Sequence, residues 1–562
     1  MDLFNSLLVI FLLLYSIAPS VSSVFVTKHL ELSKTGRYEI SANTSMELIV
    51  DVTDDSSISF IVLQAHSQKY PFVASLNESV DYYDNAMKST NPGLVVDGPV
   101  LKYGTVELFL MSELIATQVV EAMAIAYPSY SPIPGGCCLT CDVAIDPSLN
   151  VSFNPWYTKI RFQLGNSGYD AMDGDPTLCE GGGGFTYLTY QLYLYRFGEM
   201  SYDEDLALDA WQKMATVDAV KSYGTEVGSS LSFSDVKLVT VSSQPGQGVV
   251  YNVLVHDPKH DLYAAYVPYI TYGCSFTAKV DGCDAAGSVL TKVVLSIAGV
   301  AGLIFCFAGH RLFPLVVCVA GFLYFVFLSF ILLSDFVNWS HDVRVGVSAV
   351  LGVVGSLLFF FVFFRFYLVL AFVLLHGIIL GFVFSSILFF SPFGDLSFWQ
   401  NLLDYWIAFV CGMLFPAVVL LMWPRTLNIV ATAVVGSYAF IVGVNSYIQG
   451  VLSYIVLDII KKAVMPTYVS AYTDYPFEMP DIILASVWGV LAISGIIFQM
   501  WRERKDKRPA LPPWLYRKWK ESRLQYRELS SRSRESPGER RRLLETAGTA
   551  SVSSYGSLSD NK

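Results

Sequence analysis

The ionisable side chain that stands out chemically is His376, which lies near the middle of an apolar stretch over residues 366–390. An ionisable group inside a membrane span is costly, so it marks either a functional site or a neutral, hydrogen-bonded side chain. We expect a neutral imidazole bonded to a hydroxyl or carbonyl of a packed neighbour. The alternative is a proton-sensitive or ligand-binding site. Lys292 and Asp404 lie near the ends of other apolar stretches, where their charges can reach water.

A second group of polar side chains is the run from His256 to Asp261, which reads His-Asp-Pro-Lys-His-Asp. Two histidines four residues apart can bind a metal on a helix, but Pro258 prevents a helix here. A surface turn is the favoured interpretation. The sequence has no Gly-x-Ser-x-Gly motif, and the glycines at 181–184 lack the Lys-Ser/Thr of a phosphate-binding loop. His376 also has no carboxylate or second histidine beside it, which argues against an intramembrane hydrolase. We therefore predict no enzymatic activity, no cofactor and no metal.

Cysteines and glycosylation motifs indicate an oxidising compartment for the first half of the chain. Its six cysteines are disulfide candidates: Cys137, Cys138, Cys141, Cys179, Cys274 and Cys283. Cys274 with Cys283 would close a short loop, and Cys137 or Cys138 with Cys179 would close another. Glycosylation motifs begin at Asn43, Asn77 and Asn150, and a further one begins at Asn338 in a loop between apolar stretches.

The apolar stretches themselves set the architecture. Residues 1–23 resemble a cleavable signal peptide, because their apolar core is too short to span a bilayer. Each of the later stretches is about 20 residues long, as a membrane-spanning helix requires. We predict seven spans at 288–308, 312–333, 343–364, 366–390, 402–423, 426–448 and 481–500. Basic residues in alternate connections place the N-terminus outside the cytoplasm and the C-terminus inside.

The segment between the leader and the first span reads as strands. Its apolar, β-branched and aromatic residues alternate with polar ones, with one helical pattern over 203–223. We predict two extracellular β-sandwich-like units at 24–147 and 148–287, the second with one helix, ahead of a seven-helix domain at 288–500. The connection 449–480 contains an amphipathic pattern at 451–464, which predicts a helix lying along the membrane surface.

The last segment, 501–562, is a basic cytosolic tail that we expect to be disordered after an amphipathic helix at 514–529. Its juxtamembrane cations suit anionic membrane lipids, and they adjoin a span, which argues against nucleic-acid binding. Glu539 precedes Leu543 and Leu544 at the spacing of an acidic dileucine sorting signal, which endocytic adaptors bind.

Function classes can be compared from the spans. Arg365 lies between two phenylalanines where rhodopsin-like receptors carry Asp/Glu-Arg-Tyr, and the last span lacks Asn-Pro-x-x-Tyr. A G-protein-coupled receptor is therefore the least favoured class. A channel or transporter that uses the helical domain stays an alternative, although no inverted repeat is evident.

Several motifs carry a family resemblance. They include Pro134-Gly-Gly-Cys137, Ala264-Ala-Tyr-Val-Pro268, Cys306-Phe-Ala-Gly-His-Arg311, Arg425-Thr-Leu-Asn428 and Val487-Trp-Gly489. With these motifs the chain resembles the transmembrane 7 superfamily member 3 family, and its membrane half is similar to the transmembrane protein 198 family. Cys138 and Cys141 depart from the family pattern.

The resemblance implies a non-enzymatic membrane protein that promotes cell survival, attenuates endoplasmic-reticulum stress and the unfolded-protein response, and supports insulin secretion. The sequence therefore predicts a multi-pass scaffold or homeostasis factor in the plasma membrane or endomembranes. Its β units would bind an extracellular protein or glycan.

Overall fold

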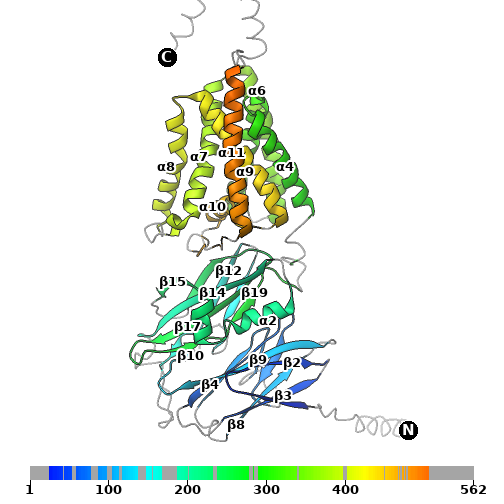
Figure 1. The fold of residues 1–562 in the computed structure, drawn as a ribbon, viewed down its shortest axis with the longest axis vertical. Coiled ribbons are helices and arrows are strands. Elements are labelled where there is room, and N and C mark those ends of the chain that lie inside the picture. The colour runs from blue at the N-terminus through cyan, green and yellow to red at the C-terminus, as the bar shows by residue number, and fades with distance from the viewer. Residues whose placement is uncertain are drawn as a thin grey trace, which may run out of the picture. The chain divides into compact units, whose positions relative to one another are not determined.

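The computed structural model describes residues 25–505 apart from internal gaps. The gaps lie at 42–43, 53–57, 78–85, 98–103, 113–116, 137–146, 155, 168–186, 200–201, 232–236, 277–282, 284–288, 338–340, 367, 396–400, 449, 466–467, 469–470, 474, 476 and 478. Two β domains precede a helical domain in the described chain (Figure 1). The predicted order of an all-β region and then a helical region is confirmed.

The first β domain is a sandwich of two sheets. Its strands are β1 (Phe25–Leu30), β2 (Thr35–Ile40), β3 (Ser45–Asp51), β4 (Ile58–His66), β5 (Phe72–Ser75), β6 (Ala86–Ser89), β7 (Gly93–Asp97), β8 (Thr105–Met111) and β9 (Gln118–Pro128). One sheet has the order β1-β3-β8-β5-β6 and the other β2-β9-β4-β7. Alternate residues of β3 are buried, as expected for a strand with one face on a core.

The second β domain adds two short helices to its sheets. Its elements are β10 (Ile133–Gly136), β11 (Asn150–Phe153), β12 (Tyr157–Phe162), β13 (Gly165–Asn166), β14 (Thr189–Glu199), α2 (Glu204–Gln212), α3 (Val217–Tyr223), β15 (Thr225–Leu231), β16 (Lys237–Ser242), β17 (Gln247–Asp257), β18 (Leu262–Ala265) and β19 (Tyr269–Thr271). The sheets run β11-β12-β16 and β15-β14-β17-β18, with β19 also on β17, while β10 pairs with β13.

The single helix predicted at 203–223 is divided in the structure. Asp203 caps α2 by accepting a hydrogen bond from the Asp205 amide, and Thr216 caps α3 by accepting one from the Ala219 amide. A side chain that caps a helix start favours a new helix at that point, because it satisfies an otherwise unpaired amide. The sequence pattern located the helical segment correctly but missed this second cap.

Strand β4 is buried on both faces, which fits the continuous apolar run Phe60–Leu63 at its centre. Ile61 and Leu63 face the core of the first β domain. Phe60 and Val62 belong instead to a core that is made mostly of second-domain residues. The two β domains therefore share buried surface through this sheet.

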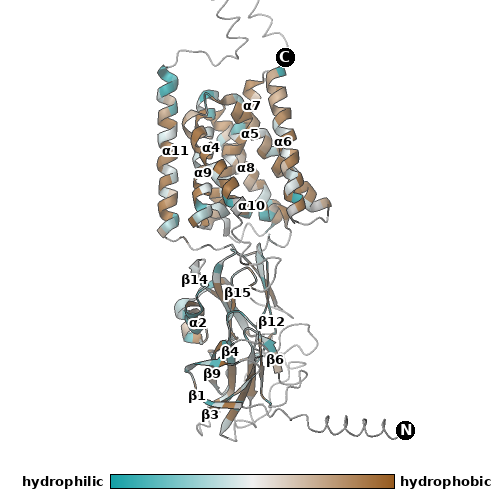
Figure 2. Ribbon diagram, turned by 90° about the vertical axis from the view of Figure 1, so that its right-hand side faces the viewer, coloured by the Kyte–Doolittle hydropathy of each residue, from teal (hydrophilic) through white to brown (hydrophobic). Residues whose placement is uncertain are grey.

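The helical domain is built from long apolar helices and one short polar-containing helix. They are α4 (Val289–Ala308), α5 (Phe313–Phe336), α6 (His341–Phe366), α7 (Val369–Phe390), α8 (Leu402–Leu420), α9 (Pro424–Ile448), α10 (Tyr454–Val464) and α11 (Met479–Lys505), with short 3-10 turns at Pro392–Asp395 and Val451–Ser453. Apolar residues dominate the helix surfaces in Figure 2.

Six helices in the described ranges are long and apolar enough to cross a membrane: Phe313–Ser334, Val343–Phe366, Val369–Phe390, Leu402–Leu420, Pro424–Ile448 and Met479–Lys505. The apolar part of α4, Lys292–Ala308, is shorter than these. A multi-pass membrane domain follows from the six helices, and the seventh crossing stays a prediction.

Candidate functional site

Helix α10 buries two charged side chains in the connection between α9 and α11. Asp458 is 5% exposed and Lys461 is 3% exposed, one turn apart on the same helix face. Buried charges are rare in proteins unless they are paired, because removing them from water is costly. This buried pair is therefore a candidate functional site in the described chain.

Two tyrosine hydroxyls complete the surroundings of Asp458. Tyr468 donates a hydrogen bond of 2.7 Å and Tyr475 one of 2.8 Å, both to Oδ1 of Asp458. Burial raises the pKa of both phenols well above the usual value, so both keep the protons that they donate. Burial also raises the pKa of the Asp458 carboxyl, while Lys461 and the two hydroxyls oppose that shift.

Lys461 is held by a carboxylate, a carbonyl and two rings. Its Nζ lies 3.7 Å from Oδ1 of Asp458 and donates to the backbone oxygen of Ser243 at 3.4 Å. It also lies 4.9 Å from the ring centroid of Tyr454 and 5.2 Å from that of Tyr468, within the range of cation–π attraction. Burial lowers the pKa of Lys461, and the nearby Asp458 carboxyl opposes this effect.

The same connection pairs with an edge strand of the second β domain. The Tyr472 amide donates to the Thr240 oxygen at 3.0 Å, and the Ser242 amide donates to the Tyr472 oxygen at 2.9 Å. Val241 and Tyr472 form a parallel bridge at the open edge of β16. An unpaired sheet edge accepts an extended segment in this way because its amides and carbonyls lack partners.

On its other side, α10 packs against the long helices. Ile455 belongs to a buried cluster with residues of α7, α9 and α11, and Ile459 belongs to another with residues of α7 and α8. The predicted helix at 451–464 is confirmed in place. Its position along the membrane surface stays a prediction; α10 buries Asp458 and Lys461 as well as its apolar face against the protein.

The start of the connection is fixed by a second set of polar contacts. Asn445 donates to the Gly450 oxygen at 2.7 Å, and the Val451 amide donates to Oδ1 of Asp481 at 2.7 Å. These bonds tie the end of α9 to the beginning of α11. We call the junction formed by α10, β16 and the described residues Met465, Tyr468, Ala471, Tyr472, Thr473 and Tyr475 the α10 junction.

The chemistry available at the α10 junction is binding rather than bond breaking. Its carboxylate, ammonium and hydroxyls already satisfy one another and are withdrawn from solvent. No group of three or more His, Cys, Asp or Glu side chains that could hold a metal occurs among the residues that the structure describes. The arrangement is suited to joining two parts of the molecule in one orientation.

His376 lies in the interior of the helical domain. Its side chain is 3% exposed, and the Phe313 ring packs edge-on against the imidazole with centroids 5.6 Å apart. The Val316 backbone lies beside the ring, but neither ring nitrogen meets the geometry of a hydrogen bond within the described chain. The expected backbone neighbour is thus present without a well-formed hydrogen bond, and the neutral state of the imidazole stays a prediction.

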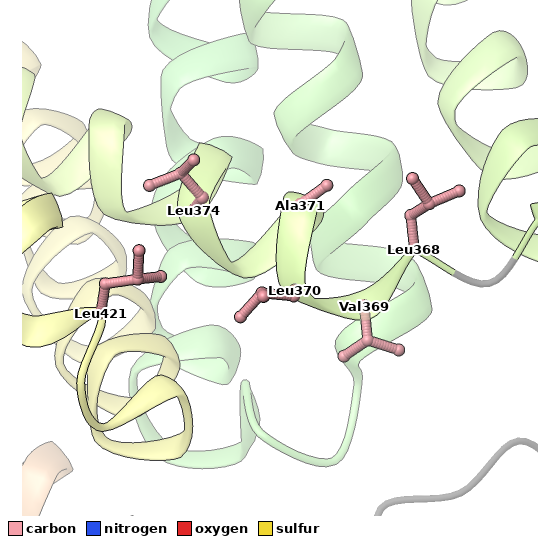
Figure 3. A pocket seen from close by; sticks show the side chains of 6 residues that line it. All are labelled: Leu368, Val369, Leu370, Ala371, Leu374 and Leu421. Carbon is pink, nitrogen blue, oxygen red and sulfur yellow. The ribbon is translucent and has the colours of Figure 1, made fainter. Parts of the chain in front are cut away.

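A pocket of about 550 Å³ opens near the beginning of α7. Figure 3 shows its lining, which is Leu368, Val369, Leu370, Ala371, Leu374 and Leu421. These side chains offer no polar group that could orient a substrate, and His376 is not among them. The pocket therefore adds no catalytic or ion-binding feature to the imidazole.

In the run from His256 to Asp261, the first two residues end β17 and residues 258–261 form the predicted turn to β18. His256 Nε2 lies 3.1 Å from Asp261, and His260 Nδ1 lies 2.7 Å from Asp257. Each histidine is thus paired with its own carboxylate. His260 also stacks on Tyr130, with centroids 4.9 Å apart. The two histidines thus make separate contacts with two carboxylates and do not point at one shared metal site.

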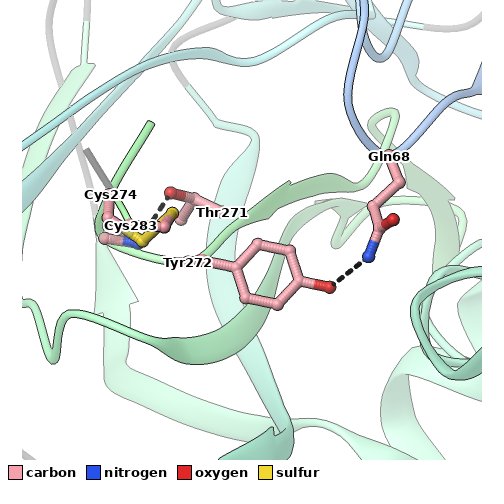
Figure 4. Close-up of a disulfide and its surroundings, with 6 residues drawn as sticks. Gln68, Thr271, Tyr272, Cys274 and Cys283 are labelled. Carbon is pink, nitrogen blue, oxygen red and sulfur yellow. Dashed lines mark hydrogen bonds between the residues drawn. A yellow bond between two sulfur atoms is a disulfide. The ribbon is translucent and has the colours of Figure 1, made fainter. Parts of the chain in front are cut away.

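The structure contains a disulfide between Cys274 and Cys283. Figure 4 shows it beside Tyr272, whose hydroxyl accepts a hydrogen bond of 2.8 Å from Gln68 of the first β domain. The other four cysteine candidates, Cys137, Cys138, Cys141 and Cys179, lie outside the described residues.

The remaining predicted sites can be placed only in part. Asn77 and Asn150 are exposed, as glycosylated residues must be. Asn43 and Asn338 lie outside the described residues, as do the leader at 1–23 and the sorting-signal candidates Glu539, Leu543 and Leu544. Glycosylation and sorting stay predictions.

Comparison with known proteins identifies the domains. The model of the "TM7SF3-like, N-terminal immunoglobulin-like domain" family matches residues 27–129, and that of the "TM7SF3-like, second immunoglobulin-like domain" family matches 132–277. The "TM7S3/TM198-like domain" model matches 295–500. These matches define a multi-pass membrane protein with two immunoglobulin-like domains ahead of its helices.

Relatives agree with the domain matches. The human protein "Transmembrane 7 superfamily member 3" is 35% identical over 473 residues, which cover 83% of this chain and 82% of the relative. The mouse protein of the same name is 35% identical over 481 residues, with the same coverage. The chain belongs to the transmembrane 7 superfamily member 3 family.

Likeness to solved structures adds nothing to this assignment. A pre-peptidase C-terminal domain of a collagenase from Bacillus anthracis aligns with 18% of this chain and 94% of its own length. The identity is 10% and the TM-score is 0.14, so the likeness carries no argument.

Proposed function

We propose that the chain is a non-enzymatic membrane scaffold whose immunoglobulin-like domains bind an extracellular or lumenal protein or glycan. The observation that carries this proposal is the α10 junction. It joins the second immunoglobulin-like domain to the helical domain through the Lys461–Ser243 and Tyr472–Thr240 hydrogen bonds. A domain held in this way presents its remaining surface in a defined orientation relative to the membrane, which lowers the entropy cost of binding.

The proposed orientation places the immunoglobulin-like domains outside the cytoplasm and the C-terminal tail inside it. The leader, the glycosylation motifs and the basic residues near α11 support this orientation. A tag placed after Lys562 should be inaccessible to an impermeant reagent on intact cells. Labelling of that tag without permeabilisation would refute the orientation.

The proposed cellular role is attenuation of endoplasmic-reticulum stress, with support of cell survival and insulin secretion. Its support is the family resemblance. In secretory cells depleted of the protein, tunicamycin should induce an unfolded-protein-response reporter more strongly than in control cells. The wild-type chain should restore the control level, whereas a chain that lacks residues 27–277 should not. An unchanged reporter response in depleted cells would contradict the role.

A transporter or channel is the second candidate, and His376 is the observation that favours it. A buried imidazole without a hydrogen-bond partner in the described chain could exchange a proton or contact a transported solute. Purified protein in proteoliposomes would then show a pH-dependent flux that His376→Ala abolishes. We expect no such flux, together with capture of a specific partner by the immunoglobulin-like domains.

A further inference from the structure

We propose that the buried Asp458–Lys461 pair makes α10 couple two parts of the chain. The second immunoglobulin-like domain then docks on the helical domain in one arrangement, and release of that domain also frees α10. This inference concerns movement within the chain and does not depend on the partner or the cellular role proposed above.

The first step of the argument is that α10 contacts both sides of the junction. On one side, Lys461 bonds to Ser243 directly after β16. On the other side, Ile455 and Ile459 pack into clusters that include residues of α7, α8, α9 and α11. A rotation of α10 that breaks the Ser243 contact must therefore also disturb these helix contacts, because one rigid turn of helix carries both sets of side chains.

The second step concerns the segment that follows α10. Tyr468 and Tyr475 both bond to Asp458, and Tyr472 lies between them in sequence and pairs with β16. The bridge to β16 is thus flanked by two contacts to the same carboxylate. Displacing β16 moves Tyr472, and Tyr468 and Tyr475 on either side of it are bonded to Asp458 of α10. Conversely, breaking the contacts of Asp458 releases Tyr472 and with it β16.

The third step is that the pair selects one arrangement. The groups around Lys461 are the Asp458 carboxylate, the Ser243 carbonyl and the Tyr454 and Tyr468 rings. Of these, only Asp458 can carry a full negative charge at neutral pH. A different docked arrangement would remove the Ser243 carbonyl from Lys461 and leave the buried pair with fewer hydrogen bonds, which is unfavourable. The charged pair therefore favours the arrangement in which the Ser243 carbonyl and the tyrosine hydroxyls complete its hydrogen bonds.

The test uses hydrogen–deuterium exchange of the full chain in lipid nanodiscs. Lys461→Met removes the cation and leaves the Asp458 carboxyl buried without its nearest counterion, so exchange should rise in β16 and in α10 together, on the order of 100-fold at the slowest amides. In Asp458→Asn/Lys461→Met no buried charge remains, and exchange in both segments should return to within about tenfold of wild type. Lys462→Met is the matched control, because Lys462 lies over the Tyr405 ring at 4.6 Å and acts on Asp458 less strongly than Lys461 does, so exchange in β16 should change far less.

Tyr472→Pro approaches the junction from the other side. It deletes the amide that donates to Thr240 and leaves both members of the buried pair in the chain. Exchange should rise in β16 and, if α10 is coupled, in α10 as well. Slow exchange of β4 in each variant verifies that the immunoglobulin-like domains stay folded. If β4 exchanges fast in Lys461→Met, exchange of α10 in Tyr472→Pro decides whether α10 and β16 are coupled. A rise confined to β16, or equal exchange in Lys461→Met and wild type, would overturn the proposal.

Discussion

His66, at the shared surface of the two immunoglobulin-like domains, makes the stability of the protein depend on pH. The side chain is 1% exposed, and its ring stacks on Trp211 of α2 with centroids 6.0 Å apart. Its Nδ1 lies 2.6 Å from the Asn91 side-chain oxygen. Because an amide oxygen only accepts, Nδ1 carries the proton and Nε2 is unprotonated. Burial lowers the pKa of His66 from 6.5 to about 4.

The sign and size of the effect follow from this pKa. The unfolded chain takes up a proton at His66 below pH 6.5, whereas the folded chain stays neutral there until about pH 4. Acidification therefore favours unfolding. The stabilising contribution of neutral His66 to the free energy of unfolding is complete above pH 6.5 and is lost as the pH falls to about 4. At ~1.36 kcal/mol per pH unit, the free energy of unfolding drops by about 2–3 kcal/mol between pH 6.5 and 4.5.

The assay compares wild type with His66→Phe, which keeps an aromatic ring on Trp211 but cannot take up a proton. Thermal or urea unfolding of the full chain in detergent, followed at pH 6.5 and 4.5, should show a loss about 2–3 kcal/mol larger for wild type than for the variant. His29→Gln, at an exposed position on β1, is the control and should keep the wild-type pH dependence. Equal losses in wild type and His66→Phe would refute the reasoning.

Other predictions address packing and surface sites. Trp211→Ala should lower the free energy of unfolding by about 3–5 kcal/mol, since Trp211 is fully buried, and urea titration checks this. Gly302→Leu should reduce the yield of monodisperse protein, because a Cβ there would lie 2.5 Å from the Gly436 oxygen of α9. Gly346→Leu should not, because beyond its own helix backbone no atom of a described residue lies within 4 Å of such a Cβ. Asn77→Gln and Asn150→Gln should each increase mobility on denaturing gels by one glycan; unchanged mobility would argue against glycosylation at these exposed residues.

The sequence predicts the parts of this molecule that depend on local pattern. Alternating polarity identified the β region, and long apolar stretches identified the spans, because each pattern reflects contacts of one segment with one environment. The division at Thr216 was missed because a cap depends on a single hydrogen bond, to the Ala219 amide. The same locality explains why the turn after His256 was predicted correctly from Pro258.

The α10 junction could not be predicted in this way. The sequence offers two signals of this site. Asp458 and Lys461 are spaced to lie on one helix face, and several tyrosines follow them. Their burial depends on Ser243, more than 200 residues earlier in the chain, as the 218-residue separation from Lys461 shows. His376 shows the converse: its burial was predicted from one apolar stretch, but its surroundings depend on Phe313 of another helix.

A cysteine cross-link tests most directly whether the second immunoglobulin-like domain docks on the helical domain through the bridge between Tyr472 and β16. Val241 and Tyr472 are bridge partners, and neighbouring strands lie about 4.8 Å apart, within reach of a disulfide. In full-length Val241→Cys/Tyr472→Cys, mild oxidation should form an intramolecular disulfide that keeps the two halves together after proteolytic cleavage between them. Leu238→Cys/Tyr472→Cys, about 10 Å out of register, should not cross-link. Failure of the first pair, or equal cross-linking of both, would contradict the account.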